Sequence, residues 1–201
     1  MAPPLLYLDQ NYLSGIAKRK PAFRELEPVL REAVARSVVA VPEGPAHRLE
    51  SAARPDLRLL ELLRGLSDGR RLPDEPAPAE RRDRSRLAWA VEHAFPERKP
   101  RDSDAVDLLA LSIALPRCAL VTCDAFMADV VRRTGLDQRY GCELFTGRRP
   151  DVQRLRERVV EWQLVAAPIC GGVRSDLRKP AKTRDYGRSS RRETIGVRVR
   201  P

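Results

Sequence analysis

Two short apolar segments that each end in an aspartate constrain the fold of this chain more than any other feature. Residues 5–9 read Leu-Leu-Tyr-Leu-Asp, and residues 119–124 read Ala-Leu-Val-Thr-Cys-Asp. Apolar runs of this length are typical of strands that are buried on both faces of a sheet. Segments 37–42 and 141–147 have the same character, and stretches with helical spacing lie between the four. The alternation predicts an α/β fold with a central, mainly parallel sheet of about four to five strands flanked by helices.

The helices expected between these strands have recognisable start and stop signals. Asn11 is a good N-cap for a helix over 12–20, and Pro21 opens a second helical stretch that runs to 36. Segment 70–82 holds three prolines and many charges, which predicts an exposed loop. Further helices are expected around His47 and Glu50 and over 55–66, 84–95, 102–115, 125–133 and 151–165.

The composition fits one domain that lies outside membranes. The chain has 201 residues, of which 42% are hydrophobic, and we assign residues 1–170 to a domain with a helical insert around 53–100. No apolar run approaches the length of a membrane helix, and the first residues lack the basic region of a signal peptide. Four scattered cysteines and only two histidines favour buried free thiols over a zinc site. We therefore expect a cytoplasmic protein with no membrane partner.

The last part of the chain has a different character. Segment 171–201 carries ten basic against three acidic side chains, so most of the formal net charge of +10 falls within it. The apolar pattern ends there, and we expect a basic, disordered tail. Such a tail suits contacts to the phosphates of RNA or to an acidic protein partner. The residues we assign to these contacts are Arg174, Arg178, Lys179, Arg191 and Arg192.

Carboxylates gather at positions that an α/β sheet brings to one edge. Asp9 and Asp124 each close a predicted strand, and functional groups of open α/β sheets collect at the carboxyl ends of the strands. Glu50 lies on the helix after the second strand, and Asp104 and Asp107 lie on the helix before the third. Converging carboxylates repel one another unless a cation lies among them. Ligands that are all oxygen suit Mg²⁺ or Mn²⁺, which can activate water for phosphodiester hydrolysis.

Four motifs follow one another along the chain. They are Asp9-Gln-Asn11 after a strand, His47-x-x-Glu50, Asp104-x-x-Asp107-Leu-Leu-Ala-Leu-Ser-Ile-Ala-Leu, and Leu-Val-Thr122-Cys-Asp124. Their order resembles the PIN domain family of metal-dependent ribonucleases, which includes the toxins of bacterial toxin–antitoxin pairs. The resemblance covers roughly residues 4–148. It implies a Rossmann-type sheet and an RNA substrate, with an antitoxin or other acidic protein as a further partner.

The resemblance also implies roles for single residues. Asp9, Asp107 and Asp124 would bind Mg²⁺ or Mn²⁺, and Glu50 would bind the metal or orient the attacking water. The third position is open between Asp104 and Asp107. We favour Asp107, because Ala110 and Ala114 then align with the small residues of the family's helix, and keep Asp104 as a reserve ligand.

Two polar neighbours have supporting roles in this interpretation. Thr122 would hydrogen-bond a ligand carboxylate, and the Asn11 amide would cap a helix or bind a water on the metal. His47 is interpreted as a surface or helix-packing residue, and Trp89 and Trp162 as packing residues. Glu43 and Asp102 are spare carboxylates that could replace assigned ligands.

Other interpretations stay open at this point. Asp9, Asp104 and Asp124 could simply cap helices, where the helix dipole favours negative charge. The protein could also be a catalytically degenerate PIN-like module that binds RNA or a protein through its basic tail. The long insert could cover the crevice or form the face of a homodimer. Phosphatases of the haloacid dehalogenase type fit less well, because their Asp-x-Asp-x-Thr motif is missing after the first strand.

Overall fold

The fold is built around three short parallel strands. The computed structural model describes residues 2–52 and 55–166. Strands β1 (Leu6–Tyr7), β2 (Leu120–Cys123) and β3 (Glu143–Thr146) form one sheet in the order β1-β2-β3. Leu6 pairs with Leu120, and Leu120 pairs in turn with Glu143, so the carboxyl ends of all three strands lie at one edge. The α/β class is thus confirmed, with a smaller sheet than the four to five strands expected.

The predicted strand over 37–42 is reduced to a single bridge between Ala40 and Leu5. Ala40 donates to Pro4 O (3.0 Å) and accepts from the Leu6 N–H (2.9 Å). To extend this pairing in either direction along the strand, the next hydrogen bonds would need the backbone N–H groups of Pro42 and Pro4. Proline has no backbone N–H group. The segment is therefore extended and buried beside β1 without continuing the sheet.

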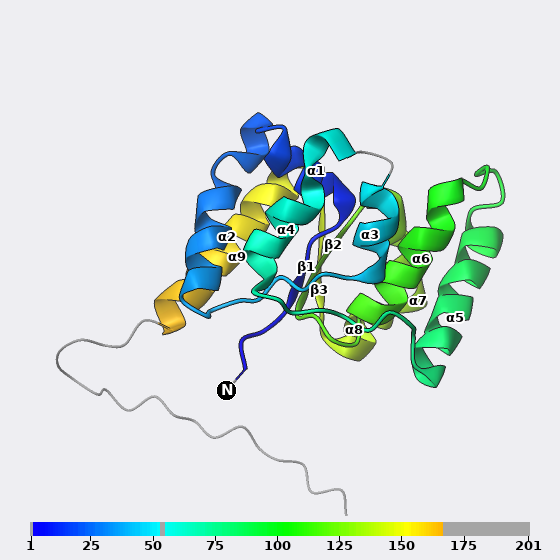
Figure 1. Cartoon of the computed structure of the whole chain (residues 1–201). Coiled ribbons are helices and arrows are strands. Elements are labelled where there is room, and N and C mark those ends of the chain that lie inside the picture. Colours follow the sequence, from blue (N-terminus) through cyan, green and yellow to red (C-terminus); the bar gives the residue numbers. More distant parts are fainter. Residues whose placement is uncertain (1, 53–54, 167–201) are drawn as a thin grey trace, which may run out of the picture. The chain divides into compact units, whose positions relative to one another are not determined.

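One face of the sheet is covered by helices from both ends of the chain. Leu6, Leu8 and Phe145 point to this face, because alternate strand residues point to opposite sides. They pack in one apolar cluster with helices α1 (Gln10–Ala17), α2 (Leu26–Ala35), α4 (Leu59–Ser67) and α9 (Arg149–Ala166). Figure 1 shows α2, α4 and α9 side by side on this face. A short 3₁₀ turn, η1 (Pro21–Phe23), leads into α2.

The opposite face packs against the middle of the chain. Tyr7, Val121 and Leu144 form a second apolar cluster with residues of the helices on that side. These helices are α3 (Pro45–Ser51), α5 (Pro78–Ala94), α6 (Asp102–Ala114), α7 (Ala125–Thr134) and α8 (Leu136–Tyr140). The sheet is therefore the middle layer of three, with α5 and α6 on the outer side in Figure 1. The insert expected around 53–100 consists of the turn η2 (Pro55–Leu57), α4 and α5.

Several local predictions differ from the structure. The helix expected over 21–36 is divided into η1 and α2, and α8 was not predicted. Glycines at both ends of α8, Gly135 and Gly141, have positive φ angles, so the five-residue helix between them has too little sequence to show a period. Asn11 lies inside α1, which Asp9 caps instead. Trp162 packs against the core as expected, but Trp89 is 60% exposed and stacks on His93.

Other expectations concern composition. Cys118, Cys123 and Cys142 are buried free thiols, as expected. Within residues 2–52 and 55–166, no helix is long and apolar enough to cross a membrane. The segment 171–201, with its five assigned contact residues, lies outside the described residues.

Candidate functional site

Asp9 and Asp124 end β1 and β2 in equivalent ways. Each caps the following helix: Asp9 Oδ1 accepts from the Tyr12 N–H (3.1 Å), and Asp124 Oδ1 accepts from the Met127 N–H (2.6 Å). The expectation that these aspartates could be helix caps is therefore correct as geometry. Capping also fixes both carboxylates at the carboxyl edge of the sheet, and Asp124 Oδ2 has no hydrogen-bond partner among the described residues. Capping and ligand binding are compatible here.

Thr122 and Asn11 hold the Asp9 carboxylate in place. The Thr122 hydroxyl accepts from the Asp9 backbone N–H (2.7 Å) and donates to Asp9 Oδ1 (3.0 Å). The Asn11 side chain donates to Asp9 Oδ2 (3.1 Å). Thr122 is fully buried on the neighbouring strand, so it ties the end of β1 to β2. The sequence led us to expect a hydrogen bond from Thr122 to one of these acidic side chains, and the structure has this bond to Asp9.

Glu50 and Asp107 complete a group of four carboxylates. Burial, followed by the charges of Asp107 and Asp9, raises the pKa of Glu50 to about 7. Burial also raises the pKa of Asp107 to about 7, with the charges of Asp124, Asp9 and Asp104 adding to it. Both side chains are half-buried. Acids that normally ionise near pH 4 therefore remain partly protonated at neutral pH in the metal-free protein.

The charge of Asp9 belongs to the same group. Burial raises the pKa of Asp9, hydrogen bonds from Tyr12, Thr122 and Asn11 lower it, and the charge of Asp124 raises it further, with a net upward shift. None of the four carboxylates forms an ion pair with a lysine or arginine of the described residues. We call Asp9, Glu50, Asp107 and Asp124 the carboxylate cluster. It is a concentration of like charge without an ion-paired cation among the described residues, and the nearby charge of Arg98 only partly offsets the upward shift in the pKa of Asp107.

Asp104 has different partners from Asp107. Arg98 holds its two oxygens by two hydrogen bonds, of 2.5 Å and 2.8 Å, and the Arg101 N–H donates to Oδ2 (2.9 Å) at the start of α6. The Arg98 hydrogen bond is the main reason why the pKa of Asp104 is lowered. Asp104 is thus a satisfied, ion-paired helix cap, and this arrangement favours Asp107 as the third acidic position. The guanidinium of Arg98 also lies over the Phe126 ring, 3.7 Å from its centroid.

The donor set fits a hard divalent cation. All four groups offer carboxylate oxygens, and their mutual repulsion would be relieved by positive charge. In their present positions, the described residues contain no set of three His, Cys, Asp or Glu side chains arranged to hold a metal ion directly. Mg²⁺ usually keeps several waters and is bound by only one or two protein carboxylates. A hydrated ion is therefore the form that the cluster suits.

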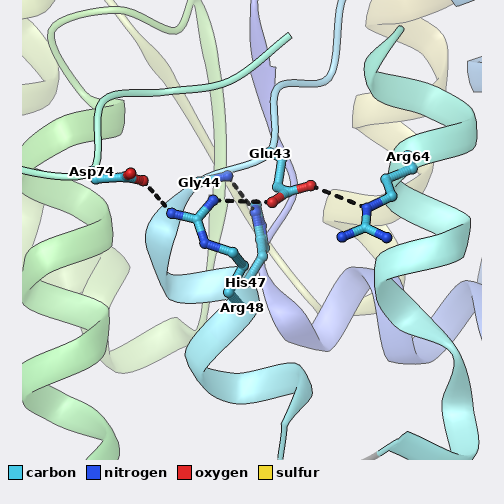
Figure 2. Close-up of polar contacts among 6 residues, drawn as sticks. All are labelled: Glu43, Gly44, His47, Arg48, Arg64 and Asp74. Atoms are coloured by element: carbon cyan, nitrogen blue, oxygen red, sulfur yellow. Dashed lines mark hydrogen bonds and ion pairs between the residues drawn. The ribbon is translucent and has the colours of Figure 1, made fainter. Parts of the chain in front are cut away.

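His47 and Glu43 fix the helix that carries Glu50 (Figure 2). His47 is fully buried, accepts from the Gly44 N–H at Nδ1 (2.8 Å) and donates from Nε2 to Leu8 O (2.6 Å). Because one partner can only donate and the other only accept, the ring is neutral with its proton on Nε2. Burial lowers the pKa of His47, in keeping with this state. His47 thus joins the start of α3 to the residue before Asp9.

Glu43 lies just before α3 and does not belong to the carboxylate cluster. It is 2% exposed and forms ion pairs with Arg48 (3.0 Å) and Arg64 (3.6 Å), as Figure 2 shows. Arg48 continues the network to Asp74. Burial raises the pKa of Glu43, but the Arg48 hydrogen bond and the charges of Arg71, Arg64 and Arg48 lower it by more. A partnered carboxylate of this kind is a structural anchor, in contrast to the four unpaired ones.

Sequence reasoning missed the partners of these side chains. Arg98 lies outside the motif positions, and no spacing rule connects it to Asp104 or connects His47 to Leu8. The nearest signal was His47-x-x-Glu50, which places both residues on one helix face.

Comparisons of the chain with protein family models, curated proteins and solved structures found no match. The functional argument therefore depends on the residues of the site.

Proposed function

We propose that the protein is a Mg²⁺- or Mn²⁺-dependent endoribonuclease that hydrolyses phosphodiester bonds at the carboxylate cluster. The observation that carries this proposal is a set of four carboxylates from four different elements. Burial and the charges of other members raise the pKa values of Asp9, Glu50 and Asp107, and none of the four is ion-paired with a lysine or arginine of the described residues. Maintaining such repulsion costs stability, so a protein that keeps it gains something from a bound cation. The choice of RNA among phosphodiesters comes from the resemblance to PIN domains.

Each side chain has a task in this reaction. Asp9, Asp107 and Asp124 would hold the ion, which supplies charge for the phosphate oxygens and lowers the pKa of a bound water. Thr122 and Asn11 keep the Asp9 carboxylate oriented. Glu50 lies on α3, and its carboxylate would accept the proton of the attacking water. His47 keeps α3 in position and takes no part in proton transfer, because both ring nitrogens are occupied.

The test is cleavage of a labelled RNA in Mg²⁺, in Mn²⁺ and in EDTA. We expect cleavage in either metal, none in EDTA, and loss of activity in Asp9→Asn and Asp107→Asn. Asp102→Asn is the matched control, because Asp102 is exposed in the first turn of the same helix as Asp107. Activity in EDTA, or equal activity of Asp107→Asn and the wild type, would refute the mechanism. RNA retention that decreases with salt, without cleavage, would support the degenerate binding module instead.

A further inference from the structure

Three hollows lie in a row beside the carboxylate cluster. The first, of about 280 Å³, has Asp124, Asn11, Lys20 and Arg148 among its lining residues. The second, of about 410 Å³, shares Lys20 with the first and adds Arg149. The third, of about 200 Å³, shares Arg149 and reaches Arg156. Because neighbouring hollows share lining residues, they form one continuous depression, which we call the basic groove.

Exposed cations line the first two hollows beyond Asp124, whereas Glu25 and Arg156 both line the third. Lys20, Arg148 and Arg149 are exposed, and none of them forms an ion pair with a described acidic residue. Arg156 at the far end is paired with Glu25 (2.9 Å). Three unpaired cations therefore follow one another along a depression whose first end is a carboxylate of the cluster. An arrangement of this kind attracts a ligand with repeated negative charge.

The walls of the groove are held by close packing. Phe23 of η1 packs on α1 at Gly15, where a Cβ atom would lie 2.7 Å from the ring. The same ring makes an edge contact with Tyr12, at 5.2 Å between centroids, and the Tyr12 hydroxyl donates to Thr146 O at the end of β3 (2.7 Å). These contacts connect η1, next to Lys20, with the strand end that precedes Arg148 and Arg149. The cations on the two walls thus have a fixed relation to each other.

We propose that the basic groove binds a single-stranded RNA on one side of the scissile phosphate, with successive phosphates at Lys20, Arg148 and Arg149. The proposal rests on the proposed function, since Asp124 lines the first hollow and belongs to the cluster. A phosphodiester chain carries one charge per nucleotide, which suits cations in a row. A flexible strand can follow the depression from α1 along η1 to the start of α9. Such a site predicts that longer RNA is bound better than a dinucleotide.

The experiment compares two double variants of the full chain that make the same change in charge. Lys20→Glu/Arg149→Glu alters the groove, and Lys18→Glu/Arg70→Glu alters two exposed residues that line none of the three hollows. Fluorescence anisotropy with a labelled 12-nucleotide RNA in EDTA gives Kd at several salt concentrations. Cleavage of the same RNA and of a dinucleotide in Mg²⁺ gives kcat and KM.

We expect the groove variant to bind the 12-nucleotide RNA at least about 10-fold more weakly. The slope of log K against the logarithm of the salt concentration should become smaller in magnitude by roughly 1 to 2. The control should change Kd by no more than about 2-fold and should leave cleavage of both substrates unchanged. Equal Kd values for the two variants would overturn the proposal, as would tighter groove-dependent binding of a poly-glutamate peptide. Because Kd is measured without metal, absence of cleavage would refute the nuclease proposal and leave the groove proposal to be decided by binding.

Discussion

Replacing Asp107 by Asn should make the metal-free protein more stable. Asp107 has a pKa of about 7, against an ordinary value of 3.8, because of burial and the neighbouring carboxylates. A shift of this size corresponds to about 4 kcal/mol of lost stability once the group is fully ionised. Since Asp107 is half-buried, solvent screening reduces the expected gain to about 1–2 kcal/mol at pH 8. Asn keeps the shape of the side chain and removes the charge.

The effect has a defined pH range and sign. The folded-state pKa of Asp107 lies above the unfolded-state value, so ionisation destabilises the native protein as pH rises from about 4 through 7. The variant should therefore gain about 3–6 °C in Tm at pH 8 in EDTA and nothing below pH 4. Addition of 10 mM Mg²⁺, on the order of what a weak site needs, should raise the Tm of the wild type more than that of the variant.

Thermal unfolding followed by circular dichroism measures these shifts, with Asp102→Asn as the control on the same helix. Asp102 lies in the first turn of α6, where negative charge is favourable, so its replacement should not stabilise the protein. A Tm of Asp107→Asn equal to or below that of the wild type at pH 8 in EDTA would show that the carboxylates do not repel one another. The electrostatic argument for a metal would then fail.

Three further outcomes follow from the contacts around the site. Gly15→Ala should destabilise the protein by about 1–3 kcal/mol in urea unfolding, because the new Cβ meets the Phe23 ring. Gly65→Ala in α4 is the matched control: its Cβ would lie 3.7 Å from the nearest neighbour, so it should stabilise the protein by about 0.5–1 kcal/mol. His47→Phe should cost about 2–4 kcal/mol by leaving two buried backbone groups unpaired. The stability of the wild type relative to this variant should fall as pH decreases below about 6.5, because the unfolded wild-type chain takes up a proton that buried His47 resists. Thr122→Val should lower the metal affinity measured by calorimetric titration roughly 10- to 100-fold, because the hydrogen bond to Asp9 is lost. Thr122→Ser keeps the hydroxyl and should restore the affinity. An unchanged affinity in Thr122→Val would contradict the role of Thr122.

The central strands could be predicted because their pattern is local. The apolar runs that end in Asp9 and Asp124 are the strands β1 and β2, since continuous burial requires continuous apolar sequence. The prediction of a strand over 37–42 was wrong, because a strand also needs backbone N–H donors, both its own and those of the neighbouring strand. Pro4 and Pro42 remove the hydrogen bonds that would have extended the bridge at Ala40.

The individual sites show the same limit. The alignment of Ala110 and Ala114 favoured Asp107 but left Asp104 open, and the position of Arg98, which ion-pairs Asp104, shows the difference between the two in the structure. The basic groove was invisible in the sequence, because Lys20 and Arg149 meet only when η1 packs beside the start of α9. Trp89 follows the apolar period of α5, yet it is exposed, since the neighbouring helices leave its side of α5 uncovered.

The sequence by itself determined the α/β class, the two strand-end aspartates and the order of the acidic motifs, because each depends on residues close together along the chain. The tertiary structure decided which carboxylates lack a counterion and where the unpaired cations lie. Ion pairing and desolvation depend on distances between residues that are far apart in sequence, such as Glu50 and Asp107. Those distances exist only after the helices have packed on the two faces of the sheet.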